Sequence, residues 1–341
     1  MDPLLNDFKA ELRTRLLDFL WRQWSALGVA GSAGAADNRI IDPEALLLFT
    51  CTLGRHDARL FDEVLDWLHA HGWLVNIMRL KRVMQTEQFA GGQTLTAIAS
   101  LLAKGAEAPK WRQLAAPVKS KAEPVELFFD SEGRSLPVFG ELEDHFARHG
   151  LKRGPLRLRG YSTGFNPIGE GTLTLQLRAL FGITARCEII AYLLTHETAH
   201  PSQIARDTYH FERGLQATLV DMSQSGSVQI RAAAREKHYW LRPERWWDLL
   251  EREAKPFPQW MTWPPLLRAW EIIWLRLGDA ELETLEPSLQ SSELRRLMSE
   301  VRPLFARSGV DRLLSDERQF PGEAYRSVFV ADLHRLLGAS M

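Results

Sequence analysis

Apolar residues recur at three- and four-residue steps through most of the first hundred positions, which is the spacing of amphipathic helices. Over 8–27 they form one continuous stripe, made of Leu12, Leu16, Phe19, Leu20, Trp24 and Leu27. Further helices with this spacing are predicted over 44–53, 57–70 and 75–85. Asp42 and Pro43 are suited to the N-cap and first position of one of them. Residues 1–103 are therefore predicted to form an all-helical domain.

The next part of the chain has no sustained period. Residues 104–124 hold three prolines and are predicted to be a linker, and 125–170 an irregular connecting region. Both are locally basic. The first run consists of Lys104, Lys110, Arg112, Lys119 and Lys121, against Glu107 alone, and the second of Lys152, Arg153, Arg157 and Arg159. Such runs are interpreted either as solvated faces or as patches that support a nearby binding module.

Residues 171–243 show a clear order of predicted helices and strands. An apolar helical run over 183–195 precedes a short helix over 202–207, which Pro201 opens, and a third helix over 211–223. Four residues are predicted to face inward from the third helix: Phe211, Leu215, Leu219 and Met222. Two alternating segments, 227–231 and 238–242, then predict a β-hairpin with a charged tip over 233–237.

In this order, the segments LRALFGITARCEIIAYLL, PSQIARDTYHFERGLQATLVDMSQSG and SVQIRAAAREKHYWL resemble the winged helix-turn-helix domain of bacterial transcription regulators of the ArsR and MarR kind. The resemblance covers about 65 of the 341 residues. It implies a mainly α fold, with a central winged helix flanked by helical domains, and binding to double-stranded DNA as a homodimer. The third helix would enter the major groove, and the hairpin, or wing, would contact phosphates or the minor groove.

The resemblance also implies which residues contact DNA. Base-reading candidates are Tyr209, His210, Arg213 and Gln216. Ser202 and Gln203 on the preceding helix are further DNA-binding candidates, and Arg231, Arg235 and Lys237 are the wing contacts. The sequence departs from the family pattern in two respects. Glu212 and Asp221 are acidic residues on the predicted recognition helix, and Thr208 and Tyr209 occupy a turn where glycine is common. High nonspecific affinity for DNA is therefore not expected.

The same segment contains a competing motif. His196, Glu197 and His200 spell H-E-x-x-H, which on a helix would hold zinc and activate water in a metalloprotease. Pro201 disfavours helical backbone at His200, so the two imidazoles are not expected to share a helical face. A winged helix can also serve as the scaffold of a protein-interaction adaptor, and this alternative stays open.

Residues 244–341 are predicted to form a second helical domain, with helices over 291–305 and 321–337. Half of the 12 tryptophans lie here: Trp246, Trp247, Trp260, Trp263, Trp270 and Trp274. They are interpreted either as the core of a helical bundle or as an aromatic pocket for a small-molecule or protein effector.

Composition narrows these alternatives only in part. The 341 residues include 42 Lys and Arg against 43 Asp and Glu, so a uniformly basic DNA-binding protein is excluded. Cys51 and Cys187 have no metal-type spacing and are expected to be buried thiols in a reducing compartment. The N-terminus has no secretory pattern and no segment suits a membrane span, so the expectation is a cytoplasmic, non-enzymatic regulator without a cofactor or metal.

Overall fold

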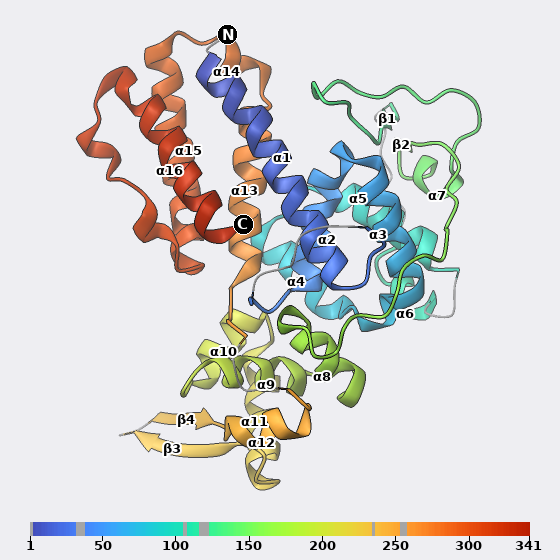
Figure 1. Ribbon diagram of the computed structural model, residues 1–341, viewed down its shortest axis with the longest axis vertical. Coiled ribbons are helices and arrows are strands. Elements are labelled where there is room, and N and C mark those ends of the chain that lie inside the picture. Colours follow the sequence, from blue (N-terminus) through green and yellow to red (C-terminus); the bar gives the residue numbers. More distant parts are fainter. Residues whose placement is uncertain (1–2, 32–37, 105–107, 116–122, 234–235, 253–257) are drawn as a thin grey trace.

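The computed structural model describes residues 3–31, 38–104, 108–115, 123–233, 236–252 and 258–341. Within these ranges the secondary structure is mainly helical, and four short strands form two separate pairs. A larger helical body lies above a smaller unit that carries a β-hairpin (Figure 1). None of the described helices is long and apolar enough to cross a membrane.

The larger body combines helices from both ends of the chain around one hydrophobic core. Its N-terminal helices are α1 (Pro3–Ala26), α2 (Pro43–Leu53), α3 (Ala58–His71), α4 (Ile77–Glu87), α5 (Gly92–Leu102) and α6 (Ala108–Arg112). Its C-terminal helices are α13 (Trp263–Leu277), α14 (Ala280–Thr284), α15 (Pro287–Arg307) and α16 (Tyr325–Ser340). Helix α13 joins the two groups because it contacts α1 and α2 as well as α15. The two helical regions predicted at the ends of the sequence thus share one core.

Local sequence explains the central helices of this body. All six apolar residues of the predicted stripe in α1 are buried, as the periodicity requires. Asp42 caps α2, its Oδ1 accepting a hydrogen bond from the Ala45 N–H at 3.0 Å, and Pro43 stands at the first position as predicted. Trp263 and Trp270 are buried in the core, which favours the bundle-core interpretation for these two tryptophans.

Several smaller elements pack against these helices. Strands β1 (Val125–Glu126) and β2 (Leu151–Lys152) pair in parallel beside α7 (Asp144–Ala147). The short 3-10 helices are η1 (Gly54–His56), η2 (Gly72–Leu74), η3 (Glu170–Thr172), η4 (Asp311–Leu313), η5 (Glu317–Gln319) and η6 (Gly322–Ala324). Trp111, in the segment predicted to be a linker, is buried in the main core.

The smaller unit has its own apolar core. Its elements are α8 (Leu173–Phe181), α9 (Ala185–Thr195), α10 (Pro201–Thr208), α11 (Glu212–Gln224), β3 (Gln229–Ala233), β4 (Glu236–Trp240) and α12 (Pro243–Leu249). Strands β3 and β4 pair antiparallel, from Gln229 opposite Trp240 to Ala233 opposite Glu236. A single residue between α9 and α10 extends this pairing, because Ala199 exchanges backbone hydrogen bonds of 3.0 and 2.8 Å with Tyr239.

The inward stripe predicted for the third helix is correct at three of its four positions. Leu215, Leu219 and Met222 are buried, but the prediction for Phe211 is wrong. Phe211 precedes α11 with extended backbone (φ −72°, ψ 125°), so its side chain leaves the helical stripe and is 71% exposed. The Arg82 guanidinium lies over this ring, 3.9 Å from its centre.

Candidate nucleic-acid interface

Helices α10 and α11 form a helix-turn-helix with a turn of three residues, 209–211. His200 caps α10 through Nδ1, which accepts a hydrogen bond from the Ser202 N–H, and Pro201 occupies the first helical position. Tyr209 ends α10 in the left-handed conformation, with φ 59° and ψ 40°. The chain therefore turns sharply without the glycine that this conformation favours.

The outer face of α11 is polar and open to solvent. Arg213 and Gln216 are exposed, and neither side chain makes a hydrogen bond or ion pair with any described residue. Ser202, at the start of α10, is also exposed, with its Oγ 2.7 Å from His200 Nδ1, and Gln203 is half-buried. Of the predicted base-reading residues, Arg213 and Gln216 thus stand together on one accessible helix face.

The hairpin presents two of its three predicted contact residues. Arg231 and Lys237 are exposed, whereas Arg235 lies outside the described residues. Val228 and Tyr239 are buried in the core of the smaller unit and anchor the base of the hairpin, while strands β3 and β4 extend away from the body (Figure 1).

Tyr209 is not a base-reading residue, which corrects the prediction. Its side chain is 4% exposed and turns into the larger body instead of towards solvent. Its hydroxyl donates a hydrogen bond to the carboxylate of Glu87, at the end of α4, and accepts one from Arg307 Nη2, at the end of α15, at 2.8 Å. Burial and the neighbouring Glu87 charge raise the pKa of Tyr209, so the phenol stays protonated.

His210 also faces inward, contrary to the prediction. Its Nδ1 donates to the carbonyl of Thr208 at 3.1 Å, and its Nε2 lies 3.9 Å from Oε2 of Glu188 on α9. Burial lowers the pKa of His210 despite the nearby carboxylate, so the imidazole is neutral at neutral pH. The turn between the two helices is therefore an anchor to the rest of the protein.

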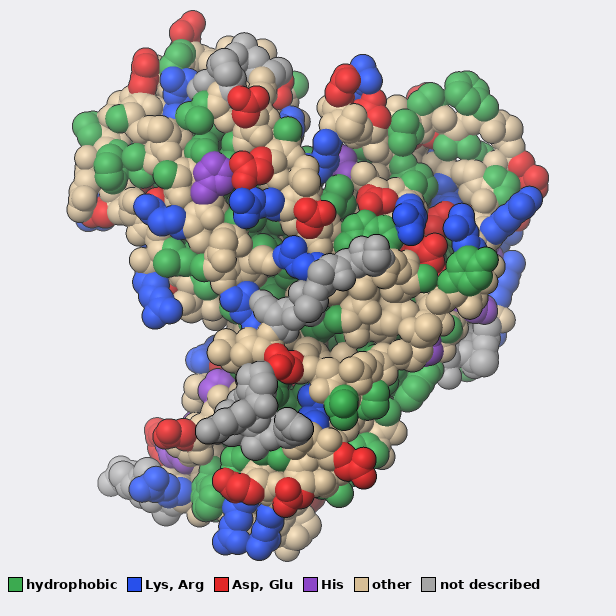
Figure 2. Space-filling model, viewed as in Figure 1, with side chains coloured by type: hydrophobic (Ala, Val, Ile, Leu, Met, Phe, Trp, Pro, Cys, Tyr) green, Lys and Arg blue, Asp and Glu red, His purple; other side chains and the backbone are tan. Residues whose placement is uncertain are grey.

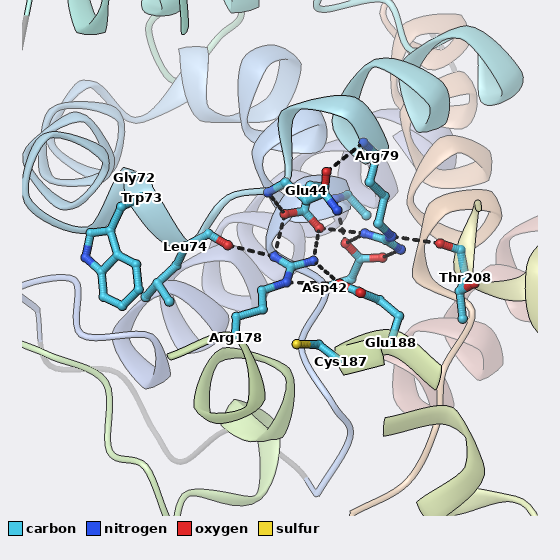
Figure 3. Close-up of polar contacts among 12 residues, drawn as sticks. Asp42, Glu44, Gly72, Trp73, Leu74, Arg79, Arg178, Cys187, Glu188 and Thr208 are labelled. Carbon is cyan, nitrogen blue, oxygen red and sulfur yellow. Dashed lines mark hydrogen bonds and ion pairs between the residues drawn. The ribbon is translucent and has the colours of Figure 1, made fainter. Parts of the chain in front are cut away.

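A buried cluster of charges, which we call the interface charge cluster, joins the smaller unit to the larger body (Figure 3). Arg178 of α8 contacts Glu44 of α2 through two hydrogen bonds, of 2.6 and 2.9 Å, and Glu188 of α9 through two more, of 3.0 and 2.6 Å. Arg79 of α4 contacts Glu44 at 2.7 Å and also Asp42. All five side chains are buried or nearly so.

The same cluster reaches the helix-turn-helix directly. Arg79 Nε donates to the carbonyl of Thr208, the last residue of α10, at 2.9 Å. Burial alone would raise the pKa of Glu44, but the charges and hydrogen bonds of Arg178 and Arg79 outweigh it and lower that pKa to about 2. The ionised carboxylate thus stabilises the junction between the two units.

The geometry of H-E-x-x-H agrees with the predicted effect of Pro201. Helix α9 ends at Thr195, and His196 and His200 both have extended backbone, so they do not share a helical face. His196 stacks on Tyr192, with ring centres 3.9 Å apart. Across the described parts of the chain, no three His, Cys, Asp or Glu side chains are grouped so that they could hold a metal ion.

The charge of the candidate interface is nearly balanced. Exposed Arg213, Arg231 and Lys237 are offset by exposed Glu212, Asp221 and Glu236. The second basic run adds little free charge, because Arg153 is paired with Asp62 at 2.7 Å, and Lys152 and Arg159 lie 3.8 and 3.9 Å from glutamates. The described residues of this surface therefore carry little net positive charge.

The interface charge cluster was not predicted from the sequence, although a signal was present. Glu44, Arg178 and Glu188 each interrupt an otherwise apolar helical segment, and charged residues are rarely buried without a partner. Opposite charges in three apolar helices could have been paired with one another. Cys51 and Cys187 are buried free thiols, as predicted.

Comparisons with protein-family models, with curated proteins and with solved structures give no match for this chain.

Proposed function

We propose that this protein is a transcription regulator that binds double-stranded DNA through α11 and the β3–β4 hairpin. The order of elements supports this proposal, because helix α9, the bridging residue Ala199, helices α10 and α11 and then the hairpin follow one another in the order expected of a winged helix. The observation that carries the proposal is the exposed face of α11, where Arg213 and Gln216 have no partner among the described residues.

The residue types on this face suit base recognition. The Arg213 guanidinium can donate two hydrogen bonds to guanine, and the Gln216 amide can both donate to and accept from adenine. Arg231 and Lys237 on the hairpin would contact phosphates and set the orientation of α11. Because regulators of this kind read paired half-sites, we expect a homodimer that protects two half-sites about one helical turn apart.

The test is a selection of duplexes from a random library and from the DNA upstream of the protein's own gene, followed by footprinting and fluorescence anisotropy. We expect Arg213→Ala to weaken binding to the selected duplex by about 5- to 150-fold, the loss of one bidentate base contact. The matched control is Arg296→Ala, since Arg296 is an exposed arginine on α15 of the larger body without a partner among the described residues.

Two outcomes would contradict the proposal. One is the absence of binding to any duplex at low salt, which would favour the adaptor alternative. The other is an equal affinity of Arg213→Ala and Arg296→Ala for the selected duplex, because α11 would then not read the DNA.

A further inference from the structure

A cavity of about 720 Å³ opens in the larger body, far from the helix-turn-helix in sequence. It lies between α1, η1, the end of α13, α14 and the loop 129–133, and Figure 2 shows the notch that separates these parts at the top of the molecule. The side chains that bear on its chemistry are Lys9, Arg13, Arg55, His56, Phe129 and Trp274.

The charges around this cavity do not cancel. Its two glutamates have partners of their own, since Glu283 lies 3.3 Å from Lys9 and Glu132 lies 2.7 Å from Arg134. Within the described ranges, neither Arg13 nor Arg55 is paired with a carboxylate. Arg55 donates instead to the carbonyls of residues 127 and 126, at 2.8 and 3.0 Å. Two cationic side chains therefore remain available to an anion.

Burial and the surrounding cations keep His56 neutral. Burial first, and then the charges of Arg13, Arg55 and Lys9, lower the pKa of His56 to about 4. The neutral ring nevertheless has a buried Nδ1 without a hydrogen-bond partner among the described residues. A buried polar atom of this kind is costly unless a ligand or water satisfies it.

Three aromatic side chains, His56, Phe129 and Trp274, line one part of the cavity. The ring of His56 stacks on Phe129 with centres 5.0 Å apart and meets Trp274 edge-on at 4.9 Å. The Arg55 guanidinium also lies over the ring of Phe129, 4.7 Å from its centre. An inorganic anion would use the cations of the cavity but would not contact the parts of Phe129 and Trp274 that line it.

We propose that this cavity binds a small organic anion with a flat apolar body, of the aromatic carboxylate class. The carboxylate would accept hydrogen bonds from Arg13 and Arg55, and the ring would pack on Phe129 and Trp274. This assignment does not depend on DNA binding, because it concerns a site in the larger body and is measured without DNA.

Isothermal titration calorimetry with naphthoate, naphthamide and inorganic phosphate tests the proposal. We expect naphthoate to bind with a Kd below about 1 mM, and the neutral amide and phosphate to bind at least about 10-fold more weakly, the size of one charge-assisted contact. Undetectable binding of naphthoate, or equal binding of naphthoate and naphthamide, would overturn the assignment.

Two variants locate the binding site. Arg13→Gln is expected to weaken naphthoate binding by at least about 10-fold. Its matched control, Arg15→Gln, lies on the same helix, where Arg15 is exposed and paired with Glu11 at 2.8 Å, and it should leave binding unchanged. Ser131→Trp, on an exposed loop at the cavity rim, should block binding without touching the core. Wild-type affinity in both Arg13→Gln and Ser131→Trp would overturn the proposal.

Discussion

At the scale of the residue, Tyr209 shows how one side chain can replace a turn glycine. Its backbone adopts the left-handed conformation, which costs a non-glycine residue on the order of 1 kcal/mol. Its buried hydroxyl is held between Glu87 and Arg307, which belong to two different helices of the larger body. The hydrogen bonds of the side chain thus offset the conformational cost and dock the turn at the same time.

We therefore expect Tyr209→Phe to lower the free energy of unfolding by about 1–2 kcal/mol, because Glu87 and Arg307 lose a buried partner while the ring stays in place. Urea unfolding measures this difference. Tyr161→Phe serves as the control, since Tyr161 is 65% exposed and should show no such loss. Equal stability of the two variants would mean that the hydroxyl of Tyr209 does not hold the turn.

At the scale of the element, α11 packs on the rest of the protein through one face only, and the hairpin through its base only. The apolar stripe of α11 packs on the smaller unit, and the opposite face is left to solvent. The hairpin is anchored at its base by Tyr239, and its strands extend beyond the rest of the unit (Figure 1). Exposed elements on a rigid base are suited to contact with a large, grooved partner.

The double variant Arg231→Ala, Lys237→Ala is expected to reduce the salt dependence of DNA binding. If each residue neutralises one phosphate, the slope of log K against log salt should become less negative by about 2. Anisotropy titrations of the selected duplex over a salt series measure this slope, with Arg296→Ala as the control. An unchanged slope would contradict phosphate contact by the hairpin.

At the scale of the whole molecule, two apolar cores are joined by polar contacts. The interface charge cluster links α2 and α4 of the larger body to α8 and α9, and Arg79 continues it to the end of α10. Loss of one member of a buried ion pair leaves the other charge uncompensated, at a cost of about 3–5 kcal/mol. The junction is therefore sensitive to single substitutions and to protonation.

The stability of the junction should depend on pH through Glu44. The pKa of Glu44 is about 2 in the folded protein, against an ordinary value of 4.5. Its contribution to the free energy of unfolding is therefore complete above pH 4.5 and is lost as the pH falls towards the folded-state pKa of about 2. We expect Glu44→Gln to lower the free energy of unfolding by about 3 kcal/mol near pH 7 but only about 1 kcal/mol near pH 3.

Urea unfolding at both pH values measures the difference in the free energy of unfolding between Glu44→Gln and the wild type. Glu281→Gln is the control, since Glu281 is exposed on α14 and should show no pH-dependent difference from the wild type. If the difference in unfolding free energy between Glu44→Gln and the wild type stays constant with pH, Glu44 is not the ionised centre of the junction.

Much of the candidate interface was predictable from local pattern. The order of α9, α10, α11 and the hairpin follows from apolar spacing and from Pro201, and so does the exposure of Arg213 and Gln216 opposite the stripe of α11. Tyr209 and His210 were placed wrongly, because they lie in a turn whose side-chain directions do not follow helical spacing. Their directions depend on Glu87, Arg307 and Glu188, which are remote in sequence.

The sequence by itself determined most of the longer helices, the cap of α2 and the apolar faces of α1 and most of α11, because these properties depend on neighbours within a few positions. Only the tertiary structure decided that helices from both ends of the chain share one core, that Arg178 meets Glu44, and that Arg13, His56 and Trp274 line one cavity. The physical reason is that ion pairs and cavities join side chains at any separation along the chain, and their partners are chosen by the packing of whole helices.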